Sequence, residues 1–157
     1  MEKIAKFKGL SETELERIFG KNVEKEEKGY LGFIHFFDTL VEGKERPIQK
    51  RILIDKFTGG VMYGGLFNET PVAGKLHIRV DLEDEDKRAA GLLLMALRDL
   101  GLGILPLGSG SSIGRGFMTG TELRVKDGTE LIAKINLQSR KIEQGADLIA
   151  EYIKAVV

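Results

Sequence analysis

The apolar residues of this chain change their spacing along the sequence, and this change limits the fold more than any other feature. Over residues 75–82 they alternate with polar residues, as in a strand with one buried face. Over 87–100 they recur at helical spacing, which predicts a helix that covers a sheet. Ser11 and Glu14 have the spacing of a capping box, so we expect another helix between Ser11 and Gly20. This mixture predicts an α+β fold with helices packed on a mainly antiparallel sheet.

The segment that follows the first helix has its own local patterns. Aromatic and β-branched residues over 30–41 predict a strand that is buried on much of both faces, and a second strand is expected over 48–57. Residues 58–74 contain five glycines. We therefore expect a long loop or an irregular hairpin there, lying over the sheet.

The C-terminal third also divides into elements. After a glycine-rich loop, the dipeptide Asp127-Gly128 predicts a tight turn between two strands, residues 117–126 and 129–137. The remaining residues, 139–157, have an amphipathic helical pattern that Gly145 weakens. A β-hairpin and a last helix are therefore expected after the glycine-rich loop.

Length and composition fit a single domain over residues 1–157. A chain of this length buries enough surface to hold a core without a metal or a disulfide. It has no cysteine and two histidines, and its acidic run, residues 83–86, precedes a helix, where carboxylates oppose the positive end of the helix dipole. We therefore expect no metal site, no cofactor and a reducing, cytoplasmic setting. No apolar run reaches the roughly 18 residues of a membrane span, so a membrane partner is not expected.

A glycine-rich motif at residues 107–117 is the clearest candidate for a ligand site. The 24 basic and 24 acidic residues cancel, so any site for a polyanion must be local. Small residues let a phosphate approach the backbone, and an arginine adds charge, although a loop chosen for tight packing is the alternative. The strand expected next excludes a dinucleotide fingerprint, and no lysine marks a nucleotide-triphosphate loop. The candidate contacts are Gly108, Gly110, Ser111, Ser112, Gly114, Arg115 and Gly116.

A second candidate site lies between Lys44 and Val61. Five basic and two acidic residues between Lys44 and Lys56 give this stretch a local net charge of +3. A strand ends there in a lysine, an aromatic ring and a hydroxyl before two glycines, which suits contact with single-stranded nucleic acid. A solvated strand edge protected by lysines is the alternative. The candidate contacts are Arg46, Lys50, Arg51, Lys56, Phe57 and Thr58.

Four sequence blocks together resemble the RAMP superfamily, the repeat-associated proteins of CRISPR-Cas systems. The blocks are Ile18–Gly20, Gly32–Asp38, Ile54–Glu69 and Leu107–Gly116, and their order and spacing are more specific than any one of them. The likeness is to the backbone subunit of type III effector complexes. It implies a ferredoxin-like, RNA-recognition-motif-like core that binds guide RNA through backbone contacts and oligomerises into a filament.

The same resemblance implies roles for two segments, and the chain also departs from the family pattern at its start. In the family, the stretch that matches residues 54–69 feeds a protruding hairpin that wedges between segments of the RNA duplex, and the glycine-rich loop packs beside the RNA path. Family members place a βα unit and an acidic target-cleaving loop before the matching region, and Lys8-Gly9 resembles a remnant of their Lys-Gly RNA-binding turn. The cleaving aspartate has no counterpart here, so cleavage does not carry over. Either the chain is a divergent or partial member, or a partner supplies the first strand.

These observations predict a non-catalytic RNA-binding subunit of a CRISPR effector ribonucleoprotein in antiviral defence. Its expected partners are guide RNA and other effector subunits, in a homo- or hetero-oligomer. One alternative is a metal-independent endoribonuclease that processes guide RNA, in which His35 would act with Tyr30 or Tyr63. We expect His35 to be a core histidine instead, and His77 to be solvated. Another alternative is a RAMP-fold interaction module that does not bind RNA.

Overall fold

The computed structural model describes residues 10–21, 29–83, 85–108 and 110–156. These residues form two compact units. Phe36–Asp81 make up the second unit, and the described residues on either side of it make up the first. Within the described residues, the strands form one sheet of three strands and four sheets of two strands. Helices combined with antiparallel sheets confirm the α+β class, while the single domain over 1–157 stays a prediction.

The first described helix, α2 (Glu12–Phe19), begins at the predicted capping box. The Ser11 hydroxyl accepts a hydrogen bond from the Glu14 N–H at 3.3 Å, and the Glu14 carboxylate accepts one from the Ser11 N–H at 2.8 Å. Gly20 ends the helix at a φ of 85°, which glycine adopts without a steric cost. The predicted start and end of this helix are therefore both confirmed.

Helix α3 (Lys87–Gly101) carries the core of the first unit. The Asp86 carboxylate caps it by accepting hydrogen bonds from the backbone amides of Arg88 at 2.9 Å and Ala89 at 3.0 Å. The acidic run thus serves the start of a helix, as predicted, although its member Asp84 lies outside the described residues. Among the described helices, none combines the length and the apolar character that crossing a membrane requires.

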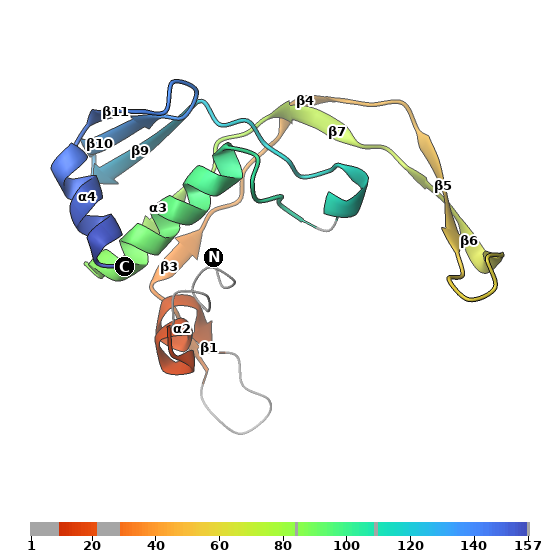
Figure 1. Ribbon diagram of the computed structural model, residues 1–157, viewed down its shortest axis with the longest axis horizontal. Helices are drawn as coiled ribbons and strands as arrows, with labels where there is room; N and C mark the ends of the chain where they lie inside the picture. Colours follow the sequence, from red (N-terminus) through yellow and green to blue (C-terminus); the bar gives the residue numbers. More distant parts are fainter. Residues whose placement is uncertain (1–9, 22–28, 84, 109, 157) are drawn as a thin grey trace. The chain divides into compact units, whose positions relative to one another are not determined.

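A three-stranded antiparallel sheet packs against α3 (Figure 1). Its strand order is β11-β10-β9, and Leu94 of α3 forms the core cluster with Leu123 and Leu137. The predicted hairpin is confirmed, with the turn one residue later than expected, since Asp127 pairs with Glu130, and with a first strand that begins at Glu122 rather than at residue 117. The strands are β9 (Glu122–Asp127), β10 (Glu130–Asn136) and β11 (Lys141–Gln144).

The C-terminal residues differ from the single helix that the sequence predicts. Residues 141–144 form β11, and helix α4 (Ala146–Lys154) begins only after Gly145. Gly145 has a φ of 73°, and a side chain there would collide with the carbonyl oxygen of Ile132. This glycine therefore separates a strand from a helix rather than weakening one helix.

The second unit is one long antiparallel hairpin (Figure 1). A hydrogen bond of 2.7 Å from the Arg46 N–H to the Pro71 carbonyl joins its two ladders. At its base the Phe37 N–H donates to the Arg79 carbonyl at 3.2 Å. In these ladders β4 (Glu42–Glu45) pairs with β7 (Val72–Lys75), and β5 (Gln49–Ile54) pairs with β6 (Val61–Glu69).

The hairpin corrects two predictions, both made from local patterns. The long loop or irregular hairpin expected over 58–74 is wrong, because β6 and β7 occupy most of this range as one arm of a longer hairpin, and β6 alone has nine residues. The long buried strand expected over 30–41 is also wrong, because that segment is broken and Leu40 is 88% exposed. Hydrogen bonds from a partner strand overcome the low strand propensity of glycine in β6. The segment 30–41 holds the short strands β2 (Tyr30–Leu31), which pairs with β1 (Gly20–Lys21), and β3 (Ile34–Phe36).

Two further predicted strands are shorter than expected. Strand β5 lies inside the predicted strand 48–57 and is exposed along most of its length. Of the predicted strand 75–82, only Lys75, the last residue of β7, and β8 (Val80–Leu82), which pairs with β3, are regular. The alternating pattern marks a face that is only partly covered, because Leu76, Val80 and Leu82 are half-buried while Ile78 is 40% exposed.

Candidate nucleic-acid interface

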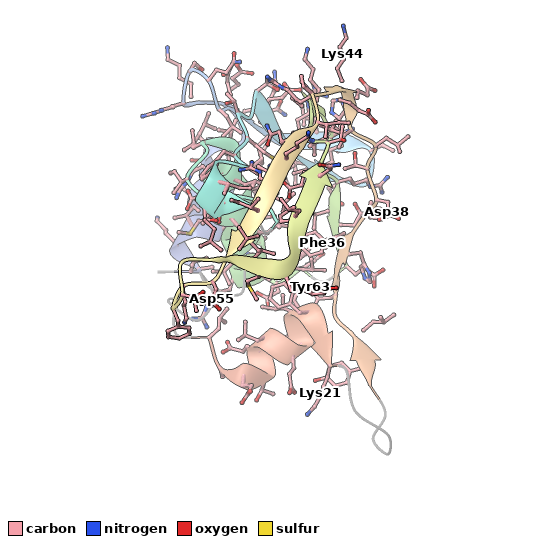
Figure 2. The ribbon with its side chains drawn as sticks, turned by 90° about the vertical axis from the view of Figure 1, so that its right-hand side faces the viewer. Lys21, Phe36, Asp38, Lys44, Asp55 and Tyr63 are labelled. Atoms are coloured by element: carbon pink, nitrogen blue, oxygen red, sulfur yellow. The ribbon has the colours of Figure 1, made fainter. Side chains whose placement is uncertain are left out.

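The turn between β5 and β6, residues 55–60, is called the tip turn below, and one side chain organises it. The Asp55 Oδ1 atom accepts hydrogen bonds from the backbone N–H groups of Phe57 at 2.8 Å and Thr58 at 2.9 Å. The same two N–H groups hold the pKa of the Asp55 carboxyl below its ordinary value. Figure 2 shows Asp55 at this turn, at the opposite end of the hairpin from Lys44.

Backbone hydrogen bonds close the tip turn further. The Gly59 N–H donates to the Asp55 carbonyl, and the Asp55 N–H donates to the Gly60 carbonyl, both at 2.9 Å. The Thr58 hydroxyl accepts from the Gly60 N–H at 3.3 Å. The turn is therefore a defined structure rather than a slack connection between the two strands.

The tip turn presents the lysine and the aromatic ring that the sequence singled out. Phe57 is 84% exposed. The Lys56 Nζ atom lies 4.9 Å from the centroid of the Phe57 ring, within the range of a cation–π contact. An exposed ring held in a fixed backbone frame is suited to stacking on a planar group.

The other predicted cations of the hairpin differ in how they are engaged. Arg46 and Lys50 are exposed, and neither forms an ion pair with a described residue. Arg51 Nε lies 3.2 Å from the Glu69 carboxylate, and its Nη2 donates to the Gln49 side chain at 2.8 Å. Arg46 and Lys50 are therefore better placed than Arg51 to meet a phosphate.

The distal part of the hairpin, residues 52–67, is apolar and exposed, and apart from Phe57 its exposed apolar side chains were not identified from the sequence as contacts. It contains one acid, Asp55, and one base, Lys56, so its net charge is zero. Tyr63, considered from sequence only as a partner of His35, is fully exposed on β6. Most of these residues stand in short consecutive runs, which are typical of strands buried on both faces, so spacing could not reveal their exposure. The exposed apolar side chains are Ile52, Leu53, Ile54, Phe57, Val61, Met62, Tyr63, Leu66 and Phe67.

The glycine-rich loop, residues 107–116, closes on itself in the first unit. The Leu107 N–H donates to the Gly116 carbonyl at 2.9 Å, and a 3₁₀ turn, η1 (Ser111–Ile113), lies between them. Ser109 lies outside the described residues. Positive φ angles, which favour glycine, occur at Gly108 (83°), Gly114 (77°) and Gly116 (75°).

Several amides of this loop already donate inside it. Those of Ile113 and Arg115 donate to the Gly110 carbonyl at 3.2 and 2.9 Å, and that of Gly114 donates to the Ser111 carbonyl at 3.1 Å. A side chain at Gly110 would collide with the Arg115 side chain, so this glycine makes room for the arginine. An anion at the loop would therefore meet the two serine hydroxyls and Arg115 rather than these three amides.

The predicted contacts fall into two groups. Six of them, from Arg46 to Thr58, lie on the hairpin of the second unit, and the glycine-rich loop belongs to the first unit. Each group is a candidate by itself. The assignment of RNA contacts to either group stays a prediction.

Within the first unit, His35 and Tyr30 contact different carboxylates. His35 Nε2 lies 3.3 Å from Glu83 Oε1 but makes no hydrogen bond with any described residue. The Tyr30 hydroxyl donates to Glu16 at 3.4 Å instead, and His77 is exposed. Across the described ranges, no three histidine or carboxylate side chains come together as metal ligands.

One protein-family model matches the chain, that of the RAMP superfamily, over residues 2–119. The comparison with curated proteins finds no match, and the comparison with solved structures finds none either. The matched range includes the hairpin and the glycine-rich loop, and it ends before β9. Because this range is well over half of the chain, the protein belongs to the RAMP superfamily and is a CRISPR-Cas-associated protein.

Proposed function

We propose that this protein is a non-catalytic RNA-binding subunit of a type III-like CRISPR effector ribonucleoprotein in antiviral defence. Its partners are guide RNA and other effector subunits, with which it forms a homo- or hetero-oligomer in the cytoplasm. A ferredoxin-like, RNA-recognition-motif-like core forms part of the proposal. The support comes from membership of the RAMP superfamily and from the hairpin of the second unit.

The observation that carries the proposal is the division of the hairpin into a charged part and an apolar part. Arg46 and Lys50 lie on the part nearer the base, whereas residues 52–67 carry no net charge and expose their apolar side chains. A two-stranded ribbon is marginally stable alone, and an exposed apolar surface of this kind marks a site of interaction. Strands of RNA offer phosphates to the cations and unpaired bases to the apolar part.

The contacts divide by chemistry. Arg46, Lys50 and Lys56 neutralise phosphates, and the ring of Phe57 stacks on a base. The glycine-rich loop adds a second contact through its serine hydroxyls and Arg115. Backbone and phosphate contacts carry no sequence information, so RNA of many sequences binds.

Two measurements test the proposal. Nucleic acid that co-purifies with the protein is expected to be short RNA of uniform length. In fluorescence anisotropy with a labelled single-stranded RNA, Phe57→Ala is expected to weaken binding about tenfold, because stacking contributes about 1–3 kcal/mol per base. Leu40→Ala, at an exposed apolar residue outside the tip turn, is the matched control and is expected to bind normally. Absence of RNA binding by the wild-type protein contradicts the proposal.

The interaction module is the second candidate, and the zero net charge of residues 52–67 favours it. This candidate predicts that the hairpin binds effector subunits and that the protein does not bind RNA. Specific cleavage of guide-RNA precursor that His35→Ala abolishes would instead establish the processing nuclease.

A further inference from the structure

The tip turn contains an acid where a surface for a polyanion would be expected to have none. Asp55 is the sole acid among residues 52–67, and it precedes Lys56 and Phe57 directly. A carboxylate repels phosphate, so its presence weakens any binding that depends on charge alone. A structural reason for having Asp55 at this position must therefore outweigh its repulsion of phosphate.

The hydrogen bonds of Asp55 supply that reason. Its Oδ1 atom accepts from the N–H groups of Phe57 and Thr58, and its backbone carbonyl accepts from Gly59. These bonds fix the backbone on both sides of the Phe57 ring. Gly59 contributes a φ of 68°, with open space where a Cβ would stand. One face of the ring meets the Lys56 ammonium, and the residue remains 84% exposed.

We infer that Asp55 is a positioning residue, which holds the tip turn so that the Phe57 ring stacks on an unpaired RNA base. The inference rests on the proposed function and deepens it, because it assigns to Asp55 the task of holding the ring that stacks on the base. An ordered ring loses less conformational entropy on binding than a mobile one does. The repulsion is small because the single charge of Lys56 balances that of Asp55 within residues 52–67, so the gain from order exceeds it.

If Asp55 acts mainly through its charge, its removal strengthens RNA binding, whereas if it acts by ordering the tip turn, its removal weakens binding. One comparison of variants therefore separates the two roles. Asp55→Ala removes a negative charge and the hydrogen bonds, and it is expected to weaken binding of a single-stranded RNA about tenfold. Asp55→Asn keeps a side-chain oxygen for the two amides and is expected to restore binding to within about twofold. Glu45→Ala, an exposed acid on the same hairpin, is the control for charge and is expected to bind as tightly as the wild type or more tightly.

A second pair of variants loosens the turn without changing charge. Gly59→Ala strains the positive φ and is expected to weaken binding as Asp55→Ala does. Gly60→Ala is the matched control, because its Cβ would meet only the Thr58 Oγ1 at an ordinary 3.6 Å. Circular dichroism and thermal melting establish that each variant remains folded.

Two readouts distinguish positioning from a merely structural role. An RNA that contains 2-aminopurine reports stacking by quenching of its fluorescence, and Asp55→Ala is expected to lose the quenching while the dependence of affinity on salt stays unchanged. In a Phe57→Ala background, Asp55→Ala is expected to cause no further loss. Two results would overturn this inference and leave the proposed function standing. In the first, Asp55→Ala binds RNA and quenches 2-aminopurine as the wild type does. In the second, Asp55→Ala causes its full loss of binding even in the Phe57→Ala background. Failure of the wild type to bind RNA would overturn the proposed function and this inference with it.

Discussion

Two glycines of α3 allow close packing, and they differ in the atoms that lie against them. A Cβ at Gly91 would collide with the backbone carbonyl oxygen of Tyr152 in α4. A Cβ at Gly101 would lie 2.7 Å from the Leu137 Cδ1 atom, the far end of a flexible side chain. Backbone has to move in the first case, whereas a change of rotamer can relieve the second.

Gly91→Ala and Gly101→Ala each add one methyl group to α3, and Gly91→Ala is therefore expected to destabilise the protein more. We expect it to lower the free energy of unfolding by about 1–3 kcal/mol, because α3 and α4 must separate. Gly101→Ala is the control and is expected to cost less. Urea denaturation of both variants checks this, and an equal or reversed order would show that the two helices do not pack through Gly91.

At the scale of elements, the outer face of the β9–β11 sheet is occupied by ion pairs. Lys134 of β10 lies 2.7 Å from the Glu143 carboxylate of β11 and 3.5 Å from that of Glu122 in β9. Arg124 also pairs with Glu122. The three strands contain no aromatic residue, so this face lacks the rings on which an RNA-recognition motif stacks bases.

This ion-pair network predicts how stability depends on pH. Hydrogen bonds from Lys134, the stronger cause, and from Asn136 lower the pKa of Glu143 below its ordinary value. A carboxyl with a lowered folded-state pKa stabilises the fold above its unfolded pKa of 4.5 and loses that contribution as the pH falls through the folded value. Glu143→Gln is expected to reduce the loss of stability between about pH 6 and about pH 3. Urea midpoints over this range check it, with Glu130→Gln as control.

The glycine-rich loop yields a prediction that separates binding from packing. Gly114 has a φ of 77° and open space where a Cβ would stand, so Gly114→Val strains the loop without disturbing the core. We expect RNA affinity to fall more than the melting temperature does. Gly114→Asn, which tolerates this φ, is expected to bind better than the valine variant. A lower melting temperature with normal binding by the folded fraction would make the loop a packing device.

At the scale of the whole molecule, net charge and local charge have different consequences. The chain is neutral overall, yet its candidate contacts are local cations on the hairpin and at the glycine-rich loop. Such contacts release counterions from RNA, so affinity depends on salt even though the protein carries no net charge.

With four or five phosphates neutralised, log affinity for single-stranded RNA is expected to fall against log salt concentration with a slope of about −3. Lys50→Gln should make the slope shallower by about 0.7, the value of one contact. Lys154→Gln, on α4 outside both candidate groups, should leave it unchanged. An affinity that does not depend on salt, or that is confined to one RNA sequence, would contradict the proposed contacts.

Local sequence determined the features that depend on interactions between residues close together in the chain. The capping box of Ser11 and Glu14, the cap of α3 at Asp86 and the hairpin near Gly128 were all predictable, because each depends on hydrogen bonds or φ angles within a short segment. The resemblance to the RAMP superfamily was likewise present in the sequence, and the match to the family model confirms the superfamily. Lys56, Phe57 and Thr58 were identified because their residue types occur together at a turn.

Tertiary structure decided what depends on partners distant in the sequence. Strand β6 forms although it contains Gly64 and Gly65, because β5 supplies its hydrogen bonds across the ladder. Strand β11 forms through pairing with β10, which a helical pattern over 139–157 could not reveal. Apolar spacing shows which residues share a face, and only the packed chain shows whether that face is covered. The exposed apolar side chains of residues 52–67, and the role of Asp55 in holding the turn between them, therefore became visible only in the structure.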